Sequence, residues 1–215
     1  MRPLVVLRPE PGATATAARA DALGLTVRRH PLFAAQAIDW TLPDHPFDAL
    51  LLTSANAVRL AGPLPALPAH AVGEATAEAA RAAGLKVLTV GEAGVESLLD
   101  RLPSGLRLLH LAGEERLLPN APRQQITSVT VYRMAPLSLP AASLLEGAVA
   151  LIHSPAAGRR LAEVEMARDR VRVAAISPAA AAACGSGWER CEAATSPSDG
   201  ALLSLAAKLC EEQRR

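Results

Sequence analysis

The amino-acid sequence predicts an α/β protein with mainly parallel sheets. Two observations carry this prediction: short apolar runs alternate with alanine-rich helical segments along almost the whole chain, and one such strand–helix unit is written twice. Strands that alternate with helices are typical of parallel sheets, in which each helix carries the chain back across the sheet. With 215 residues, the chain is long enough for one large domain or two small ones.

The individual elements follow from hydrophobic pattern and turn residues. Short runs rich in valine, leucine and isoleucine predict strands at 3–8, 25–31, 48–53, 70–73, 85–90, 106–111, 128–134, 148–153, 171–176 and 189–194. Alanine-rich segments predict helices at 13–23, 55–62, 75–83, 94–102, 141–147, 156–167, 179–184 and 198–212. Gly24 and Gly84 stand where two of these helices should end.

An internal repeat is the most informative feature of the sequence. The stretch "ALLLTSANAVRLAG" (49–62) is echoed by "VALIHSPAAGRRLA" (149–162). Four further pairs share an offset of 104 residues: 2–9 with 106–113, 25–31 with 129–135, 71–80 with 175–184, and 95–99 with 199–203. Two copies of one α/β unit explain this pattern, and simple tandem duplication would place them at 1–104 and 105–215. Such a doubled architecture predicts a ligand in the cleft between the copies, at the carboxyl ends of the strands.

Composition excludes several classes of function. The formal net charge is +1 and only 2% of residues are aromatic, so neither charge nor stacking favours nucleic-acid binding. No run of about 18 apolar residues predicts a membrane span, and the first residues do not read as a signal peptide, so the cytoplasm is expected. Three cysteines at no ligand spacing predict neither a metal site nor a disulfide framework. Without an unexplained apolar stripe, a monomer is expected.

Motifs for nucleotide binding or a nucleophilic serine are absent, and the histidines form no metal-ligand pattern. What recurs is a strand that ends in a hydroxyl residue or glycine and runs straight into a helix, at Thr53–Ser54, Gly73, Ser154, Ser177 and Thr195–Ser196. Helix starts carry unpaired amides and partial positive charge, so a group of them predicts a site for an anionic ligand. Arg8, at the end of the first strand, would add a guanidinium that can bind an anionic group through two N–H donors. The alternative, that each hydroxyl caps only its own helix, stays open.

Tyr132 is the only tyrosine and lies at a strand exit between the two copies, in "VTVYRM". A single tyrosine is commonly a packing residue with a satisfied hydroxyl. Its neighbour Arg133 and its place between the copies favour instead a phenol that faces the cleft. Both interpretations stay open at this point.

The order and spacing of these segments resemble the uroporphyrinogen-III synthase family over nearly the whole chain. The segments that carry the resemblance are 5–24, 47–59, 71–87, 129–134, 149–161 and 194–205. The resemblance implies two flavodoxin-like (Rossmann-like) domains with parallel sheets, joined by a two-stranded linker. It also implies that the chain crosses over early and returns late. The first domain would then hold 1–34 plus 137–215 and the second 36–133, with linkers near 33–38 and 132–137.

The implied substrate is hydroxymethylbilane, a linear tetrapyrrole that bears eight carboxylates. The implied reaction expels water, inverts the last pyrrole ring through a spiro intermediate, and closes the macrocycle to uroporphyrinogen III. Because the pyrroles supply the electrons that expel the hydroxyl, the resemblance implies no metal, redox cofactor or covalent nucleophile. The protein would fold the bilane and orient its last ring. The preceding pathway enzyme, hydroxymethylbilane synthase, is an expected partner.

Matching motif positions carries site residues over from the family. Tyr132 would hydrogen-bond the departing hydroxyl and assist its protonation. The residues expected to bind substrate are Arg8, Ser54, Ala55, Asn56, Ala75, Thr76, Ser154, Ala156 and Ser196. Two departures from the family pattern stand out: the turn at 177–181 lacks the usual hydroxyls after Ser177, and the segment 113–128 is too short, and too interrupted by proline, for the usual helix.

Two other classes of function remain open from the sequence. A two-lobed module that binds an anionic small molecule without chemistry would explain the duplicated halves equally well. A degenerate synthase domain kept for interaction with another pathway enzyme would explain the short segment 113–128. The binding module predicts that Tyr132 is replaceable and that no product forms.

Overall fold

The computed structural model describes residues 1–92, 94–116 and 119–211, and the chain divides into two compact units. Unit 1 contains residues 1–34 and 136–215, and unit 2 contains residues 35–135. The tandem division at residue 104 is therefore wrong, because the chain leaves unit 1 after its first two strands and returns a hundred residues later. Each unit is an α/β structure whose paired strands are mostly parallel, as the alternation of strands and helices predicts.

Unit 1 is built on a five-stranded sheet with the order β11-β10-β9-β1-β2, in which all neighbouring strands run parallel. Its strands are β1 (Leu4–Val6), β2 (Val27–Arg29), β9 (Val149–Ile152), β10 (Arg172–Ala175) and β11 (Arg190–Ala193). Its helices are α1 (Gly12–Ala22), α5 (Ala142–Leu145), α6 (Pro155–Ala162), α7 (Pro178–Ala183) and α8 (Asp199–Glu211), with a 3₁₀ turn at Arg168–Arg170. The helix expected over 156–167 thus ends five residues early, at a C-cap on Glu163.

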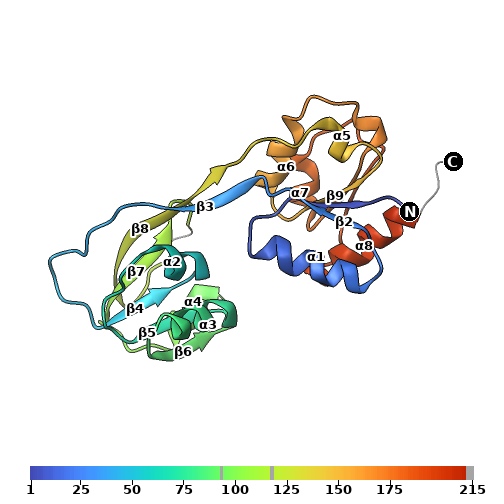
Figure 1. Cartoon of the computed structure of the whole chain (residues 1–215). Helices are drawn as coiled ribbons and strands as arrows, with labels where there is room; N and C mark the ends of the chain where they lie inside the picture. Colours follow the sequence, from blue (N-terminus) through green and yellow to red (C-terminus); the bar gives the residue numbers. More distant parts are fainter. Residues whose placement is uncertain (93, 117–118, 212–215) are drawn as a thin grey trace. The chain divides into compact units, whose positions relative to one another are not determined.

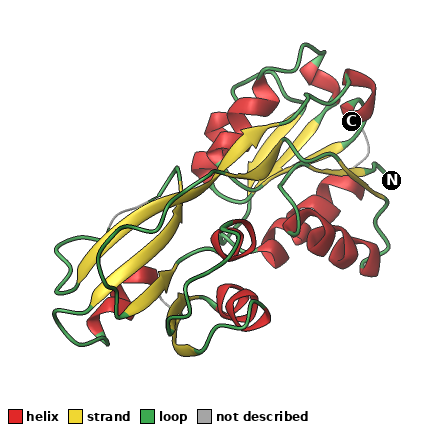
Figure 2. Ribbon diagram, turned by 60° about the vertical axis from the view of Figure 1, so that its left-hand side comes forward, coloured by secondary structure: helices red, strands yellow, loops and turns green. Residues whose placement is uncertain are grey.

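Helices cover both faces of this sheet, which explains why its central strands read as unbroken apolar runs (Figures 1 and 2). Alternate residues of a strand point to opposite faces. Val5, Ala150 and Val173 pack in a core with residues of α5, α6 and α7. Leu4 and Leu151 pack on the other face with residues of α1 and α8. Each fully buried leucine of these two layers contributes on the order of 2 kcal/mol to folding.

Unit 2 is built on a six-stranded sheet with the order β3-β8-β7-β4-β5-β6. Its strands are β3 (Phe33–Ala37), β4 (Ala49–Leu52), β5 (Ala69–Val72), β6 (Val87–Gly91), β7 (Arg107–Gly113) and β8 (Gln125–Pro136). Its helices are α2 (Ala55–Leu60), α3 (Glu74–Ala82) and α4 (Gly94–Asp100). The strands from β8 to β6 pair in parallel. The apolar pattern did not predict β3 as a strand, although the family resemblance implied a two-stranded linker near 33–38 and 132–137. Strand β3 lies beside β8, at the boundary between the units.

The two faces of the unit 2 sheet are covered unequally. Leu50 and Leu52 pack with residues of α2 and α3 on one face. Leu51 packs with residues of α4 on the other face. Among the described residues between β7 and β8 there is no helix, although unit 1 has α1 in the corresponding connection. The expectation that segment 113–128 forms no helix is therefore confirmed for its described part.

The sequence repeat maps onto the two sheets strand by strand. Read from one edge, unit 1 has the order β2-β1-β9-β10-β11, and unit 2, after its additional edge strand β3, has the order β8-β7-β4-β5-β6. The repeated segments 2–9 and 106–113 contain β1 and β7, which take the same place in the two orders. Segments 49–62 and 149–162 contain β4 and β9, again at matching places. The prediction of a duplicated α/β unit is confirmed, with the copies interleaved along the chain rather than consecutive.

None of the helices within the described ranges has the length and apolar character needed to cross a membrane.

Candidate functional site

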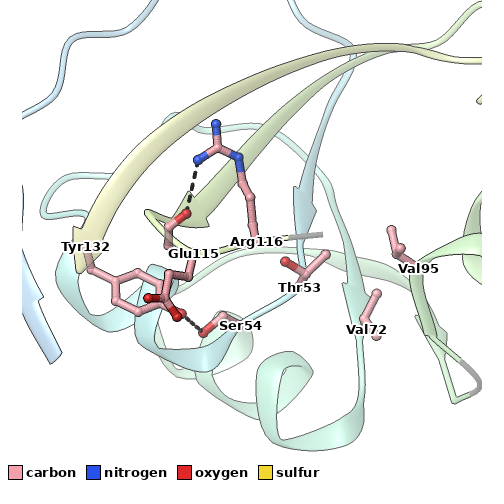
Figure 3. A pocket seen from close by; sticks show the side chains of 8 residues that line it. Thr53, Ser54, Val72, Val95, Glu115, Arg116 and Tyr132 are labelled. Carbon is pink, nitrogen blue, oxygen red and sulfur yellow. Dashed lines mark hydrogen bonds between the residues drawn. The ribbon is translucent and has the colours of Figure 1, made fainter. Parts of the chain in front are cut away.

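A pocket of about 270 Å³ lies in unit 2, at the carboxyl ends of β4, β5 and β7 (Figure 3). Its lining combines two apolar side chains with hydroxyl, phenol and charged groups: Thr53, Ser54, Val72, Val95, Gly113, Glu115, Arg116 and Tyr132. In open parallel sheets this edge is where ligands bind. The polar groups come from three separate parts of the chain, so only folding brings them together.

The place of Tyr132 depends on Gly113. The two residues are paired across β7 and β8 where the register shifts. A Cβ atom added to Gly113 would lie 2.8 Å from Cζ and 2.9 Å from Oη of the tyrosine. Any side chain at position 113 would therefore push the phenol away. Glycine is needed here for close approach of the ring to the backbone.

The phenol of Tyr132 and the hydroxyl of Ser54 point toward each other, with 3.0 Å between Oη and Oγ (Figure 3). Ser54 is the N-cap of α2, and its Oγ also accepts a hydrogen bond from the backbone N–H of Asn56, at 3.2 Å. The N-cap Ser54 and the phenol of Tyr132 thus fix each other's position at the N-terminus of α2. Of the predicted site residues, the structure brings Tyr132 and Ser54 into direct contact.

Two charged residues of this pocket were missed by the sequence analysis. Glu115 and Arg116 come from the connection between β7 and β8, and both line the pocket. The Arg116 guanidinium is anchored through Nη1, which donates to the carbonyl oxygen of Gly113 at 3.1 Å and to Oγ1 of Thr130 at 3.0 Å. The proline-broken segment that contains them follows no periodic pattern, so its sequence gave no signal for a site.

Beneath the pocket lies a buried histidine. His110 on β7 is 1% exposed, and its Nε2 lies 2.9 Å from Oγ1 of Thr53, which lines the pocket. Its Nδ1 lies 3.1 Å from Oγ of Ser128 on β8. Burial, together with the positive charge of Arg116, lowers the pKa of His110 to about 4. The imidazole is therefore neutral at physiological pH.

The other predicted residues of unit 2 do not line this pocket. Ala55 and Asn56 form the first turn of α2, where the Asn56 amide is already bonded to Ser54. Ala75 is exposed in the first turn of α3. Thr76, one residue further, is only 5% exposed. The geometry adds nothing to the predicted roles of Ala75 and Thr76, which stay predictions.

In unit 1, two of the predicted residues lie at the start of α6. Ser154 is the N-cap of this helix, and its Oγ accepts from the backbone N–H of Ala157 at 3.2 Å. Ala156 follows in the first turn. Ser196 is exposed and bonds Ser198, whose Oγ accepts from the N–H of Ala201 at the start of α8. Ser198, rather than Ser196, therefore caps the last helix.

Arg8 belongs to an ion cluster of unit 1, centred on Asp199 in the first turn of α8. One carboxylate oxygen, Oδ1, accepts from the Arg8 guanidinium at 3.3 Å and from Oγ1 of Thr16 at 2.9 Å. It also lies 3.0 Å from Nε2 of His153. The second oxygen accepts from Nε of Arg19 at 2.8 Å. Four side chains thus converge on one carboxylate, two from α1 and two from the residues that follow β1 and β9.

Burial and the hydrogen bonds of this cluster shift the pKa values of Asp199 and His153. Burial raises the pKa of Asp199, but hydrogen bonds from His153, Arg19 and Thr16 outweigh it, and the pKa lies below its usual range. Burial lowers the pKa of His153, against the opposing effect of Asp199. Arg8 therefore donates hydrogen bonds to Asp199 and Thr16 within unit 1, and its predicted contact with substrate stays a prediction. Among the residues described, no group of three or more His, Cys, Asp or Glu side chains could hold a metal ion.

Fold and pocket together define a class of protein: two α/β units with parallel strands and a polar, tyrosine-containing pocket at the carboxyl ends of the strands in one of them. Comparison with known proteins makes the assignment specific. The family model for uroporphyrinogen-III synthase HemD matches residues 14–204. The chain therefore belongs to the uroporphyrinogen-III synthase family, whose members are cyclising lyases of haem biosynthesis.

Solved structures agree on the fold. The chain resembles the uroporphyrinogen-III synthase of Helicobacter pylori with a TM-score of 0.69 and 20% sequence identity, over 97% of this chain and 100% of that one. It also resembles a substituted form of the synthase of Thermus thermophilus, with a TM-score of 0.50 and 22% identity, over 98% and 100% of the two chains. Among curated proteins, none matches the sequence significantly.

Proposed function

We propose that this chain is a uroporphyrinogen-III synthase, which cyclises hydroxymethylbilane to uroporphyrinogen III with loss of water and inversion of the last pyrrole ring. The observation that carries this proposal is the family match over residues 14–204. The pocket of unit 2 supports it, because it presents a phenol, hydroxyls and a guanidinium to a ligand rich in carboxylates. Chemistry of this kind depends on orientation of the substrate more than on a reactive side chain.

Tyr132 is the proposed acid catalyst. The hydroxyl of the bilane is a poor leaving group until it receives a proton or a strong hydrogen bond. Ser54 lies 3.0 Å from the phenol oxygen and already accepts the Asn56 amide, so its own proton is available to that oxygen. The phenol proton is then directed to the substrate hydroxyl. The C–O bond breaks, water leaves, and the pyrrole nitrogen lone pair supplies the electrons.

Glu115 and Arg116 take complementary roles in this proposal. Departure of water leaves a positive charge delocalised over the terminal pyrrole, and a carboxylate in the pocket stabilises that charge. Glu115 is placed to do so. Arg116 lines the same pocket with an anchored guanidinium, which suits a substrate carboxylate. One acidic and one basic group would thus act on opposite charges of the same molecule.

The finer architecture is part of the proposal. The unit 1 sheet, numbered along the chain, has the order 2-1-3-4-5, which supports a flavodoxin-like domain. Strands β3 and β8 are neighbours at the boundary between the units, which supports a two-stranded linker. Motif position supports substrate contacts for Arg8, Ala55, Asn56, Ala75, Thr76, Ser154, Ala156 and Ser196. A cytoplasmic monomer that receives its substrate from hydroxymethylbilane synthase completes the proposal.

A coupled assay tests the proposed function. Hydroxymethylbilane is generated freshly by hydroxymethylbilane synthase in the presence of the protein, and the products are oxidised and separated by isomer. Unassisted closure yields isomer I, so we expect a protein-dependent excess of isomer III. Isomer I as the sole product with folded protein would exclude the synthase. A ligand-binding module or a degenerate domain would then be the better interpretation, and tetrapyrrole binding without turnover would separate the two.

A further inference from the structure

His110 is a buried titratable side chain that the proposed chemistry leaves unused. It stands between two hydroxyls on neighbouring strands: Thr53 at the end of β4 lies 2.9 Å from Nε2, and Ser128 on β8 lies 3.1 Å from Nδ1. Thr53 faces the pocket (Figure 3). A continuous chain of hydrogen bonds therefore leads from Ser128 through the imidazole to Thr53, which lines the pocket.

The charge state of the imidazole restricts how this chain of hydrogen bonds can be protonated. Because His110 is neutral at physiological pH, one ring nitrogen donates and the other accepts. The two hydroxyls must then take opposite roles. If Nε2 carries the proton, Thr53 accepts from it, and the proton of the threonine is free to point elsewhere. If Nδ1 carries the proton, the Thr53 hydroxyl donates its proton to Nε2, and only its lone pairs are left to face the pocket.

We propose that His110 is a positioning residue whose Nε2–H donates to Thr53, so that the Thr53 hydroxyl donates into the pocket to a substrate carboxylate. This inference rests on the proposed function, because the substrate supplies the carboxylates. The carboxylate oxygens of the substrate accept hydrogen bonds, so a hydroxyl that donates into the pocket attracts them. A hydroxyl that presents only lone pairs would repel them. Ser128 donates to Nδ1 and fixes the tautomer from the far side of the ring. The imidazole is too deeply buried to reach the substrate itself.

Kinetics of matched variants tests the role of Thr53 and of the ring. Thr53→Val keeps the shape and removes the hydroxyl. His110→Gln keeps a donor near the position of Nε2, whereas the shorter His110→Asn reaches only the position of Nδ1 and loses Thr53. We expect Thr53→Val and His110→Asn to raise KM about tenfold, and His110→Gln to stay within about threefold of the wild type.

The double variant sharpens this test. If the histidine acts only through the threonine, adding His110→Asn to Thr53→Val should raise KM no further. A purely structural histidine would instead lower the thermal unfolding temperature in every His110 variant and leave the KM of His110→Asn unchanged. That unchanged KM, in a protein that makes isomer III, would overturn the proposal. Additive effects of the two substitutions would overturn it as well.

The tautomer can be measured without any variant activity. In protein labelled with ¹⁵N-histidine, the ring nitrogen shifts distinguish Nε2–H from Nδ1–H, and the His110 signals are assigned by their loss in His110→Gln. We expect Nε2 to carry the proton near pH 7. An Nδ1–H tautomer would contradict the proposal whatever the activity of the protein. If the wild type makes only isomer I, the proposed function fails by itself, while the tautomer still reports whether Thr53 is left with a free proton.

Discussion

The carboxyl ends of the two sheets carry the same repeat and differ in what occupies them. In unit 2, Thr53 and Val95 line an open pocket. The repeat aligns these positions with His153 and Asp199 of unit 1, which bond each other in the ion cluster with Arg8. Small or apolar side chains at these positions leave space for a ligand. Larger polar side chains there bond one another and fill that space with the protein's own groups.

This difference shows how a duplicated scaffold can divide its tasks. The strands that match in the two orders, and the helices that follow β4, β5 and β6 in unit 2 and β9, β10 and β11 in unit 1, are common to both units, because they are set by apolar runs and turn residues. The content of the strand ends is set by a few side chains, which are free to differ. We infer that unit 2 holds the catalytic phenol and that the Asp199 cluster stabilises unit 1.

Removal of the phenol should have the largest effect. Tyr132→Phe is expected to lower kcat about a thousandfold, equivalent to about 4 kcal/mol, because the leaving hydroxyl loses its acid. The rate of isomer III formation measures this. Arg28, which the repeat aligns with Tyr132 in unit 1, provides the matched control: Arg28→Gln should stay within about twofold. Equal losses in both variants would remove the distinction between the units.

The buried histidine of unit 2 should make stability depend on pH. The pKa of His110 is about 4 in the folded chain and 6.5 when unperturbed, so between these values the unfolded chain binds more protons. The contribution of His110 to the free energy of unfolding is therefore fully present above pH 6.5. It is lost as the pH drops toward 4, by about 3 kcal/mol in total. Urea unfolding measures this: across this pH range, the free energy of unfolding should change less with pH for His110→Gln than for the wild type.

His153 is the comparison within unit 1. Its carboxylate partner Asp199 opposes the effect of burial, so His153→Gln should flatten the pH profile less than His110→Gln does. The reverse order would mean that the hydroxyl-bonded ring of unit 2 tolerates a charge better than the ring beside a carboxylate.

The Asp199 cluster should matter for stability. Asp199→Asn keeps the shape but removes the charge that Arg8 and Arg19 share, and we expect a loss of about 2 kcal/mol in the free energy of unfolding. Glu146→Gln breaks an exposed ion pair with Arg170 and should change stability far less. Guanidinium unfolding measures both. If the two variants had the same free energy of unfolding, the Asp199 cluster would stabilise unit 1 no more than an exposed ion pair does.

The smallest effect is expected at Glu115, and it has a distinctive form. Glu115→Gln should lower kcat about tenfold, or about 1.4 kcal/mol, because the developing pyrrole cation loses its carboxylate. It should also lower KM, because the neutral side chain no longer repels an anionic substrate. Glu114→Gln, the exposed neighbour outside the pocket lining, should change neither constant. A raised KM in Glu115→Gln would show that this carboxylate binds substrate instead.

Much of the fold could be predicted from the sequence, because strands buried on both faces read as apolar runs and their helices begin with caps. The apolar pattern did not predict strand β3, since "FAAQA" is short and pairs with β8; only the family resemblance pointed to this segment, as part of a two-stranded linker. The tandem reading of the repeat failed because local pattern does not reveal which copy of a strand pairs with which.

The site was less accessible to sequence reasoning. Tyr132 and Ser54 could be chosen as a unique tyrosine and a helix cap, but their contact joins residues 78 positions apart. His110 was one of five scattered histidines until folding placed it beside Thr53. Arg116 lies in a segment without any periodicity. Long-range contacts and irregular loops leave little trace in a single sequence.

The interleaving of the two copies fixes the order in which the protein can be completed during synthesis. All of unit 2 lies between residues 35 and 135, so every strand of its sheet is available before β9 has been translated. Strand β1 lies between β2 and β9, and it must wait for that partner while more than a hundred residues are added. Unit 2 can therefore fold on the ribosome as a finished body. The N-terminal β1–α1–β2 segment stays incomplete until the last third of the chain emerges.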